Sequence, residues 1–386
     1  MISASGSELG RGGLAWRVLS HRGRRTAVAV SGIAFAILFM FMQLGLHGAV
    51  VNTALAVSSR LQADLVIVSS RYRHLAETGT LPQARLFQAL ALPGVEAVSP
   101  LYVRHARWKD PRTDGRCTMV AIAFPVGQGP PLSVGEAARQ LPSLVPTGAV
   151  LVDSRSQSSC GRTAAGAEAE VNDHPVTVAG HFVLGVGFLG DGAMLMSDDT
   201  FFGLFGEHPR DQVHLGLVRL RPGASVPELA RTLREILPPD SRVLTRAEMD
   251  DLQVRHWVRD TAVGNMFGLG TVLGFLVGTA VLWQVLSNDV RNHLPEYATL
   301  KAMGYADRQL YGFVLRQSWL FALLGFLPGL MMALGLYGLI EQATRLPVFM
   351  TAPRAAGVLL LSLLMCTCAG ALTLRKLSTA DPADLF

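Results

Sequence analysis

Four long stretches of the chain contain no Asp, Glu, Lys or Arg. They run from Thr26 to Ser59, Thr261 to Asn288, Gln317 to Ile340 and Ala355 to Leu374. Each reaches the length of roughly 20 apolar residues that a helix needs to cross the hydrocarbon core of a membrane. The pattern therefore predicts four transmembrane helices, near residues 26–50, 262–287, 317–340 and 355–374.

The first apolar stretch has one alternative interpretation, a cleaved signal peptide, because basic residues precede it. A signal peptide has an apolar core of only about 7–15 residues followed by a small-residue cleavage site. The stretch from Thr26 to Ser59 is much longer, and its basic flank begins late. A membrane anchor is the better interpretation.

Composition supports a membrane protein and indicates its orientation. Half of the 386 residues are hydrophobic and only 16% are charged, which is unusual for a soluble protein. Lys and Arg are concentrated at three places. Before the first span these are Arg11, Arg17, Arg22, Arg24 and Arg25; between the second and third spans they are Arg291, Lys301, Arg308 and Arg316; after the fourth span they are Arg375 and Lys376. Because cytoplasmic flanks carry the excess of basic residues, we expect both termini and the loop 288–316 to be cytoplasmic. This topology accounts for the net charge of +5 without a nucleic-acid partner.

The resulting domain organisation is a four-helix membrane protein with a large α+β extracytoplasmic domain at residues 51–260. The remaining segments are a cytoplasmic N-terminal segment 1–25, a short outer loop 341–354 and a cytoplasmic tail 375–386. Strand-like and helix-like patterns alternate at both ends of the large domain. Its middle, residues 125–210, is richer in Gly and Pro. We expect a porter-like lobe with this middle part inserted as a β lobe.

The sequence contains no recognisable catalytic, cofactor or metal motif. A phosphate loop, an H-E-x-x-H pattern and paired C-x-x-C motifs are all missing. The predicted spans also contain no ionisable Asp, Glu, Lys or Arg, which disfavours a gradient-driven transporter. Cys117 and Cys160 fall in the outer domain, where a disulfide is permitted, but the sequence leaves their pairing open. Cys366 and Cys368 are expected to pack within the fourth span.

The cytoplasmic loop between the second and third spans has the marks of a short helix. Pro295 suits the first turn, Glu296 suits the positive end of the helix dipole, and Gly304 ends the run. Tyr297, Leu300 and Lys301 fall on one face. A surface element held by lipid headgroups is the alternative, but it would leave Tyr297, Leu300 and Met303 exposed without a partner.

This stretch, E-Y-A-T-L-K-A-M-G at residues 296–304, resembles the signature of FtsX-like, MacB-type ABC transporter permeases. The fuller form N-H-L-P-E-Y-A-T-L-K-A-M-G-Y is most similar to the DevC-type subfamily. The segment Gly180–Phe188 and the tail Ala380–Phe386 agree with it, so the resemblance spans nearly the whole chain. The superfamily usually has Arg where this chain has Pro295, so no salt bridge is carried over from that arginine.

The resemblance implies a permease subunit without its own ATPase, located in the bacterial inner membrane. It implies pairing with a second copy and binding of two copies of a cytoplasmic ABC ATPase. The coupling helix would present Glu296, Tyr297, Leu300, Lys301, Met303 and Gly304 to the ATPase. Mechanical transmission to the periplasmic domain would then drive a lipid-like or amphipathic substrate through a membrane-fusion adaptor and an outer-membrane channel.

Small residues mark one further candidate site, a dimer interface on the second span. Its members are Gly264, Gly268, Gly270, Gly274 and Gly278. Glycines at four-residue spacing allow helices to approach closely in lipid. The preceding residues 248–260 are charged and periodic, and we expect them to extend the second span outward as a stalk.

Two other functions remain open. One is a non-transport regulator, as FtsX itself is, whose outer domain controls a periplasmic partner such as a cell-wall hydrolase. The other is a sensor or enzyme with a catalytic outer domain, which no motif supports. Phe188, Phe201, Phe202 and Phe205 are candidates for lipid or adaptor contact, although large apolar residues are more often core.

Overall fold

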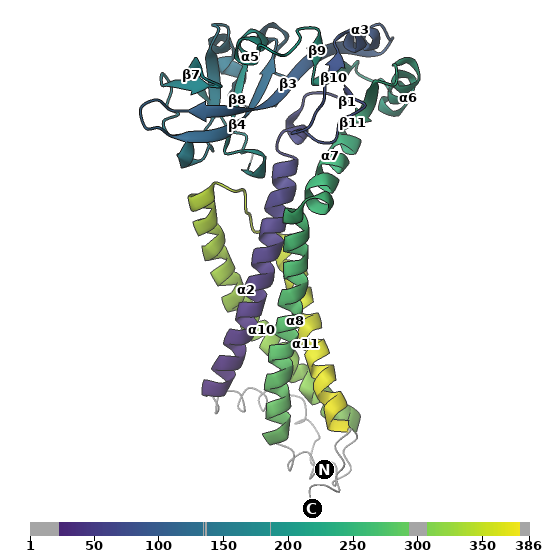
Figure 1. Cartoon of the computed structure of the whole chain (residues 1–386). Coiled ribbons are helices and arrows are strands. Elements are labelled where there is room, and N and C mark those ends of the chain that lie inside the picture. The colour runs from purple at the N-terminus through teal and green to yellow at the C-terminus, as the bar shows by residue number, and fades with distance from the viewer. Residues whose placement is uncertain (1–22, 134, 136, 186, 293–306, 379–386) are drawn as a thin grey trace, which may run out of the picture. The chain divides into compact units, whose positions relative to one another are not determined.

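The structure, a computed structural model, describes residues 23–292 and 307–378, apart from residues 134, 136 and 186 (Figure 1). The chain divides into two compact units. The helical unit comprises the described parts of residues 1–47, 266–339 and 349–386, and the sheet unit comprises residues 48–265 and 340–348.

Four long helices make up the helical unit. They are α2 (Gly23–Ala54), α8 (Ala262–Asn292), α10 (Asp307–Thr344) and α11 (Ala352–Ser378). All four are long and apolar enough to cross a membrane, over residues Ala27–Ala54, Ala262–Asn288, Val314–Thr344 and Ala352–Thr373. The expectation of four candidate transmembrane helices is confirmed.

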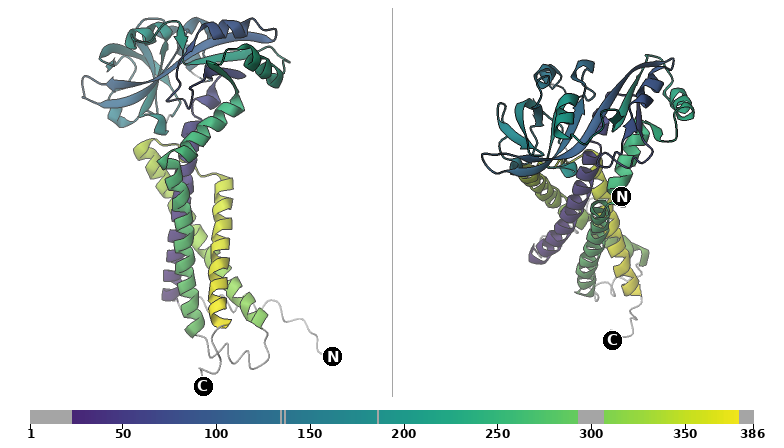
Figure 2. Two further views of the ribbon diagram at one scale, coloured as in Figure 1. Left: turned by 45° about the vertical axis from the view of Figure 1, so that its right-hand side comes forward. Right: turned by 45° about the horizontal axis from the view of Figure 1, so that its top comes forward.

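Helix α2 packs against its neighbours where they carry small residues. Ile33, Ile37 and Phe41 are fully buried and fall on one face of α2, because they are spaced four residues apart. A Cβ atom added to Gly325 of α10 would come within 2.7 Å of Ile33, and one added to Gly329 within 3.0 Å of Ile37. The glycines therefore let the α10 backbone approach α2 closely, as is common between membrane helices (Figure 2).

The sheet unit is built on one nine-stranded sheet with the order β11-β1-β10-β3-β4-β8-β5-β7-β6. The strands are β1 (Leu65–Ser69), β3 (Val95–Lys109), β4 (Arg116–Phe124), β5 (Ala149–Asp153), β6 (Glu168–Val171), β7 (His174–Phe182), β8 (Gly192–Ser197), β10 (Leu215–Leu220) and β11 (Ser241–Thr245). A separate pair is formed by β2 (Leu81–Pro82) and β9 (Gln212–Val213). The β4–β8 and β5–β7 pairs are parallel, and the other pairs are antiparallel.

Strand β3 joins the two halves of the sheet. Its first residues, up to Leu101, pair with β10, and its residues from Tyr102 onward pair with β4. Strand β4 and the end of β3 therefore belong to the second half of the sheet, and the start of an inserted lobe near residue 125 stays a prediction. The sequence pattern concealed the change of pairing because β3 is one uninterrupted strand of 15 residues, with no turn signal between its halves.

The sheet buries apolar side chains on both faces. Leu65 and Ile67 belong to one hydrophobic cluster, and the intervening Val66 belongs to the other. Helices α3 (Ala84–Leu90), α5 (Asp198–Leu204) and α6 (Val226–Ile236) add residues to the first cluster, whereas α4 (Ala137–Gln140) and α7 (Arg246–Arg255) add residues to the second. Shorter turns are η1 (Ser58–Arg60), η2 (Val126–Gln128), η3 (Leu141–Leu144), η4 (Ser158–Cys160), η5 (Gly187–Leu189) and the π-helix η6 (His256–Asp260). Because both faces are covered, the central strands read as continuous hydrophobic runs.

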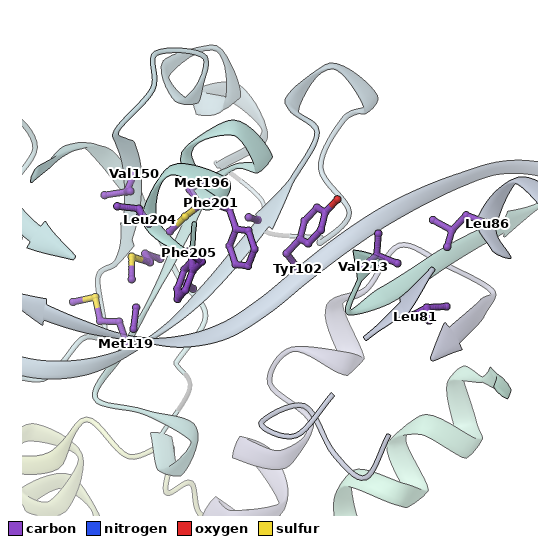
Figure 3. Packing of buried hydrophobic residues seen from close by; sticks show 14 of the residues in the cluster. Leu81, Leu86, Tyr102, Met119, Val150, Met196, Phe201, Leu204, Phe205 and Val213 are labelled. Atoms are coloured by element: carbon purple, nitrogen blue, oxygen red, sulfur yellow. The ribbon is translucent and has the colours of Figure 1, made fainter. Parts of the chain in front are cut away.

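The phenylalanines on α5 are mostly core residues. The Phe201 ring lies 4.6 Å from that of Phe205 and 5.1 Å from that of Tyr102, measured between centroids (Figure 3). Phe201 is fully buried and Phe205 is 8% exposed. Their packing against β3 accounts for them without a lipid or an adaptor.

A disulfide links Cys117 of β4 to Cys160 of η4, with the two Cα atoms 5.0 Å apart. This settles a pairing that the sequence left open. The indole of Trp108 donates to the carbonyl oxygen of Cys160 at 3.0 Å and is itself buried. Cys366 is buried in the helical unit, as expected for a packing residue.

Candidate transmission site

Both connections between the membrane spans and the sheet pass through a small region of the sheet unit. The end of α2 leads through η1 into β1, and β11 leads through α7 and η6 toward α8. These segments are the chain connections that join α2 and α8 to the sheet. We call η1, α7, η6 and the β1–β2 loop (residues 70–80) the transmission site.

Hydrogen bonds fasten η1 to α7. The hydroxyl of Ser58 donates to the Asp250 carboxylate at 2.5 Å, and the guanidinium of Arg246 donates to the Ser59 carbonyl oxygen at 2.6 Å. Both bonds involve an ionised group, which makes them stronger than neutral hydrogen bonds. The start of α7 is held by a capping box between Thr245 and Glu248. The two connecting segments are therefore joined to each other as well as to the sheet.

The β1–β2 loop is fastened to α7 through one buried amide. Gln253 is 0% exposed, its Oε1 accepts from the Leu75 backbone N–H at 3.3 Å, and its Nε2 donates to the Tyr72 hydroxyl at 2.5 Å. Burial raises the pKa of Tyr72 far above its ordinary value, so its hydroxyl remains neutral. A buried amide with both ends paired orients the loop on the helix.

Two histidines stack at the start of the π-helix. The rings of His74 and His256 are parallel with centroids 3.8 Å apart, and Trp257 packs edge-on against both. Burial, and secondarily the charge of His256, lower the pKa of His74. The Ala76 backbone N–H donates to His74 Nδ1 at 3.2 Å, which requires that nitrogen to be unprotonated. The geometry fits a neutral His74.

The helix path is interrupted directly after the π-helix. Thr261 has an extended backbone, with φ −95° and ψ 148°, so η6 and α8 are not continuous. The stalk that we expected over residues 248–260 is thus α7 plus a π-helix, with a break before the second span. The Thr261 side chain donates to the Trp257 carbonyl oxygen at 2.6 Å, which satisfies one carbonyl at the break.

A further contact connects η1 to the second half of the sheet. The Arg60 guanidinium donates to the Leu184 carbonyl oxygen at 2.6 Å. The same segment is held by the buried Asp153, which accepts from the backbone N–H groups of Leu184 and Gly185. Through Ser58, Ser59 and Arg60, η1 therefore contacts α7 on one side and the second half of the sheet on the other.

Comparison with known families identifies the chain. The model of the MacB-like periplasmic core domain matches residues 26–236, and the model of the FtsX-like permease C-terminal matches residues 268–382. The chain belongs to the MacB-like and FtsX-like permeases. Permeases of this family are components of ABC transporters.

Three solved structures similar to the permease are domains of other proteins. The periplasmic region of MacB from Actinobacillus actinomycetemcomitans is 12% identical, with a TM-score of 0.34, covering 51% of this chain and 93% of that one. The extracellular domain of the transporter YknZ from Gram-positive bacteria is 13% identical, with a TM-score of 0.32 and coverages of 43% and 90%. A domain of a putative permease protein from Porphyromonas gingivalis is 17% identical, with a TM-score of 0.31 and coverages of 47% and 88%. No curated protein sequence matches the permease.

The predicted coupling helix lies outside the described residues. This applies to all of its candidate contacts with the ATPase, namely Glu296, Tyr297, Leu300, Lys301, Met303 and Gly304. The assignment of these residues stays a prediction.

The five glycines proposed for a dimer interface divide into different environments. A Cβ atom added to Gly274 would lie 2.8 Å from Phe39, and one added to Gly278 would lie 2.8 Å from Ala36. Gly270 likewise faces the Gln43 side chain of α2, and Gly264 faces the backbone of Val258 and Trp257. Gly268 has no described atom within 4 Å. Four of the glycines thus permit close packing within the permease itself, and Gly268 is the one that faces open space.

Sequence reasoning did not identify the residues of the transmission site. His74, Gln253 and His256 stand in unremarkable contexts and meet only because the β1–β2 loop folds over α7. The charged pattern of α7 was a usable signal, because it marked a helix before the second span. Among the described residues, no group of three or more His, Cys, Asp or Glu could hold a metal ion.

Proposed function

We propose that this permease is a mechanical subunit of an ABC transporter: it pairs with a second copy, binds two copies of a separate cytoplasmic ATPase, and transmits their motion to the sheet unit. The observation that carries this proposal is the joining of η1 to α7 by Ser58 with Asp250 and by Arg246 with Ser59. A flexible linker would absorb a displacement of α2 or α8. Connections that are fastened together pass the displacement on to the sheet.

Two independent arguments support a periplasmic location for the sheet unit. Basic residues flank the opposite ends of the spans, which favours a cytoplasmic location for those ends. The Cys117–Cys160 disulfide supports an oxidising compartment for the sheet unit. The protein would then be an inner-membrane permease with both termini cytoplasmic.

The cargo follows from the subfamily that the coupling sequence resembles. DevC-type permeases imply export of a lipid-like or amphipathic substrate from the periplasm through a membrane-fusion adaptor and an outer-membrane channel. The absence of ionisable Asp, Glu, Lys and Arg from the four apolar stretches disfavours transport driven by an ion or proton gradient. Energy would come from the ATPase alone.

A disulfide trap tests the transmission site. In Ser58→Cys/Asp250→Cys, oxidation would lock η1 to α7, and transport by the reconstituted complex should continue because these segments already move together. In Ser58→Ala/Asp250→Ala, ATP hydrolysis should persist while transport falls several-fold. Equal transport by this variant and the wild type would refute mechanical transmission through the site.

The coupling helix and the partners need separate experiments. Leu300→Asp or Glu296→Arg should abolish co-purification of the ATPase while leaving membrane insertion intact. Mass spectrometry of proteins bound to the intact complex distinguishes the two functions: an adaptor indicates transport, whereas a cell-wall hydrolase without an adaptor indicates the FtsX-like regulator.

A further inference from the structure

A recess of about 610 Å³ lies between α2 and α8 in the helical unit. Its lining residues are Val28, Val281, Trp283, Gln284, Val285, Ser287, Asn288 and Arg291. All but Val28 come from the last three turns of α8. The recess therefore lies at the end of the second span, which extends to Asn288.

The recess forms because α2 and α8 separate beyond a pair of close contacts. The helices approach closely where Gly278 faces Ala36 and where Gly32 lies against Val281, at 3.0 Å from the Gly32 Cβ position. One turn earlier on α2, Val28 is 71% exposed. The ends of α2 and α8 are correspondingly apart in Figure 1.

The lining changes from apolar to polar along α8. Val281, Trp283 and Val285 line the part farther from the helix end, with Gln284 as a polar residue among them, and Ser287, Asn288 and Arg291 follow at the end of the span. An acyl chain matches the first part, and a hydrogen-bond acceptor with negative charge matches the second. Arginine binds carboxylate and phosphate oxygens well, and phosphate is the group that phospholipid headgroups carry.

One lining group is left without a partner. The Ser287 hydroxyl oxygen is buried and has no hydrogen-bond partner among the described residues. Serines in helices ordinarily bond to a carbonyl oxygen of the preceding turn, as Ser318 does with Val314. A buried unpaired hydroxyl is costly. The Ser287 oxygen is closed off from the recess, so a turn of the side chain about χ1 is needed to bring the hydroxyl to an acceptor there.

From these observations we propose that the recess binds one anionic phospholipid, with its headgroup phosphate at Ser287 and Arg291 and the start of an acyl chain against Val281 and Val285. The site needs only that the helices span a bilayer. It does not depend on the ATPase or the cargo, so its failure and the failure of the proposed function are distinguishable.

The test uses the full-length permease in nanodiscs of phosphatidylcholine with increasing phosphatidylglycerol, and measures the thermal unfolding midpoint. The midpoint of the wild type should rise with phosphatidylglycerol and saturate. Arg291→Gln should weaken the apparent affinity roughly tenfold, because it removes a hydrogen bond to a charged group. Gln284→Trp should have a similar effect, because the indole would occupy the recess without changing its charge.

A matched control removes a different arginine. Arg316 is exposed near the start of the α10 span and does not line the recess, so Arg316→Gln should respond to phosphatidylglycerol as the wild type does. Equal midpoints of all variants in pure phosphatidylcholine would show that they are folded.

The proposal is overturned if Arg291→Gln and Gln284→Trp respond to phosphatidylglycerol like the wild type, or if Arg316→Gln loses the response to the same extent. It is also overturned if inorganic phosphate added to phosphatidylcholine nanodiscs raises the midpoint as phosphatidylglycerol does, because the ligand would then be a free anion.

Discussion

His74 of the β1–β2 loop and His256 of the π-helix stack with their ring centroids 3.8 Å apart, immediately before the point where the helix path breaks at Thr261. The pair fastens the loop to the segment that leads into the second span. The stacking of the two rings is stable only when His74 is neutral, because two positively charged imidazolium rings at this distance would repel each other. The stability of the connection between the second span and the sheet therefore depends on pH.

The first prediction concerns this pH dependence. The pKa of His74 is lowered by burial and by His256, with Arg73 and His105 adding to the effect and Glu77 opposing it. Because the pKa of His74 is lower in the folded state than in the unfolded state, the unfolded state binds the proton first as the pH falls. The fold is therefore fully stable above the ordinary histidine pKa of about 6.5 and loses stability as the pH falls below it. Hydrogen exchange over residues 70–80 should therefore accelerate as the pH is lowered from about 7.5 to 5.5, after correction for intrinsic rates.

A phenylalanine at position 74 keeps the stacking and removes the titration. His74→Phe should abolish the pH-dependent part of the exchange in this loop, whereas His174→Phe, at an exposed position of β7, should leave it unchanged. If the loop in His74→Phe still opens at low pH, another group is responsible.

The second prediction concerns the disulfide. Cys117 and Cys160 close a loop over a sequence separation of 43, and such a cross-link typically contributes about 2–4 kcal/mol to the free energy of unfolding. Dithiothreitol should therefore lower the unfolding midpoint of the sheet unit within the full chain. The double variant Cys117→Ala/Cys160→Ala should start at the lower midpoint and not respond to the reductant.

The third prediction concerns Asp110, at the turn between β3 and β4. Its buried carboxylate accepts from the Thr113 hydroxyl and from the backbone N–H groups of Arg112 and Arg162. Although burial opposes ionisation, these bonds lower the pKa of Asp110 to about 2. The stabilisation is present above the ordinary pKa of about 3.9 and is lost as the pH falls toward the folded-state value.

Replacement of Asp110 should be costly at neutral pH. Asp110→Asn loses the charge from three hydrogen bonds, and we expect about 2 kcal/mol less free energy of unfolding, measured by denaturant titration of the full chain. Asp114→Asn in the same turn is the control, because Asp114 is exposed and paired only with the exposed Arg116. A cost for Asp114→Asn equal to that for Asp110→Asn would contradict the assignment.

The fourth prediction separates packing within one permease from packing between two. Gly274→Val should destabilise the helical unit by more than about 1 kcal/mol, because a Cβ atom there meets Phe39 at 2.8 Å. Gly268→Val should leave the monomer unaffected, because no described atom lies within 4 Å of that site. Cysteine cross-linking in membranes then tests the dimer. A dimer band for Gly268→Cys supports contact between two copies at the face that carries Gly268. A dimer band for Gly274→Cys, with none for Gly268→Cys, would contradict the assignment of Gly274 to packing within one permease.

The sequence was sufficient for features that local chemistry sets. Long apolar runs without charges specify membrane helices in any fold, so the four spans were predictable. The coupling sequence and the tail indicated the family that the domain comparisons then identified. Helix α6 begins directly after Ser225, its N-cap residue, although the Ser225 side chain makes no capping hydrogen bond.

The extent of the inserted lobe was not predictable in the same way. Strand β3 carries no signal at Leu101 and Tyr102, where its pairing changes from β10 to β4. Pairing partners are chosen by hydrogen bonds between distant segments. Turn signals therefore do not show where the pairing of β3 changes.

By itself, the sequence determined what must be buried in lipid, because the cost of a charge in hydrocarbon depends on the residue and not on its neighbours. Only the tertiary structure decided which residues meet. Gly274 faces Phe39 of its own chain, Cys117 faces Cys160, and Ser58 faces Asp250. Each of these contacts depends on the relative placement of segments far apart in the chain, which local hydrophobic patterning leaves undetermined.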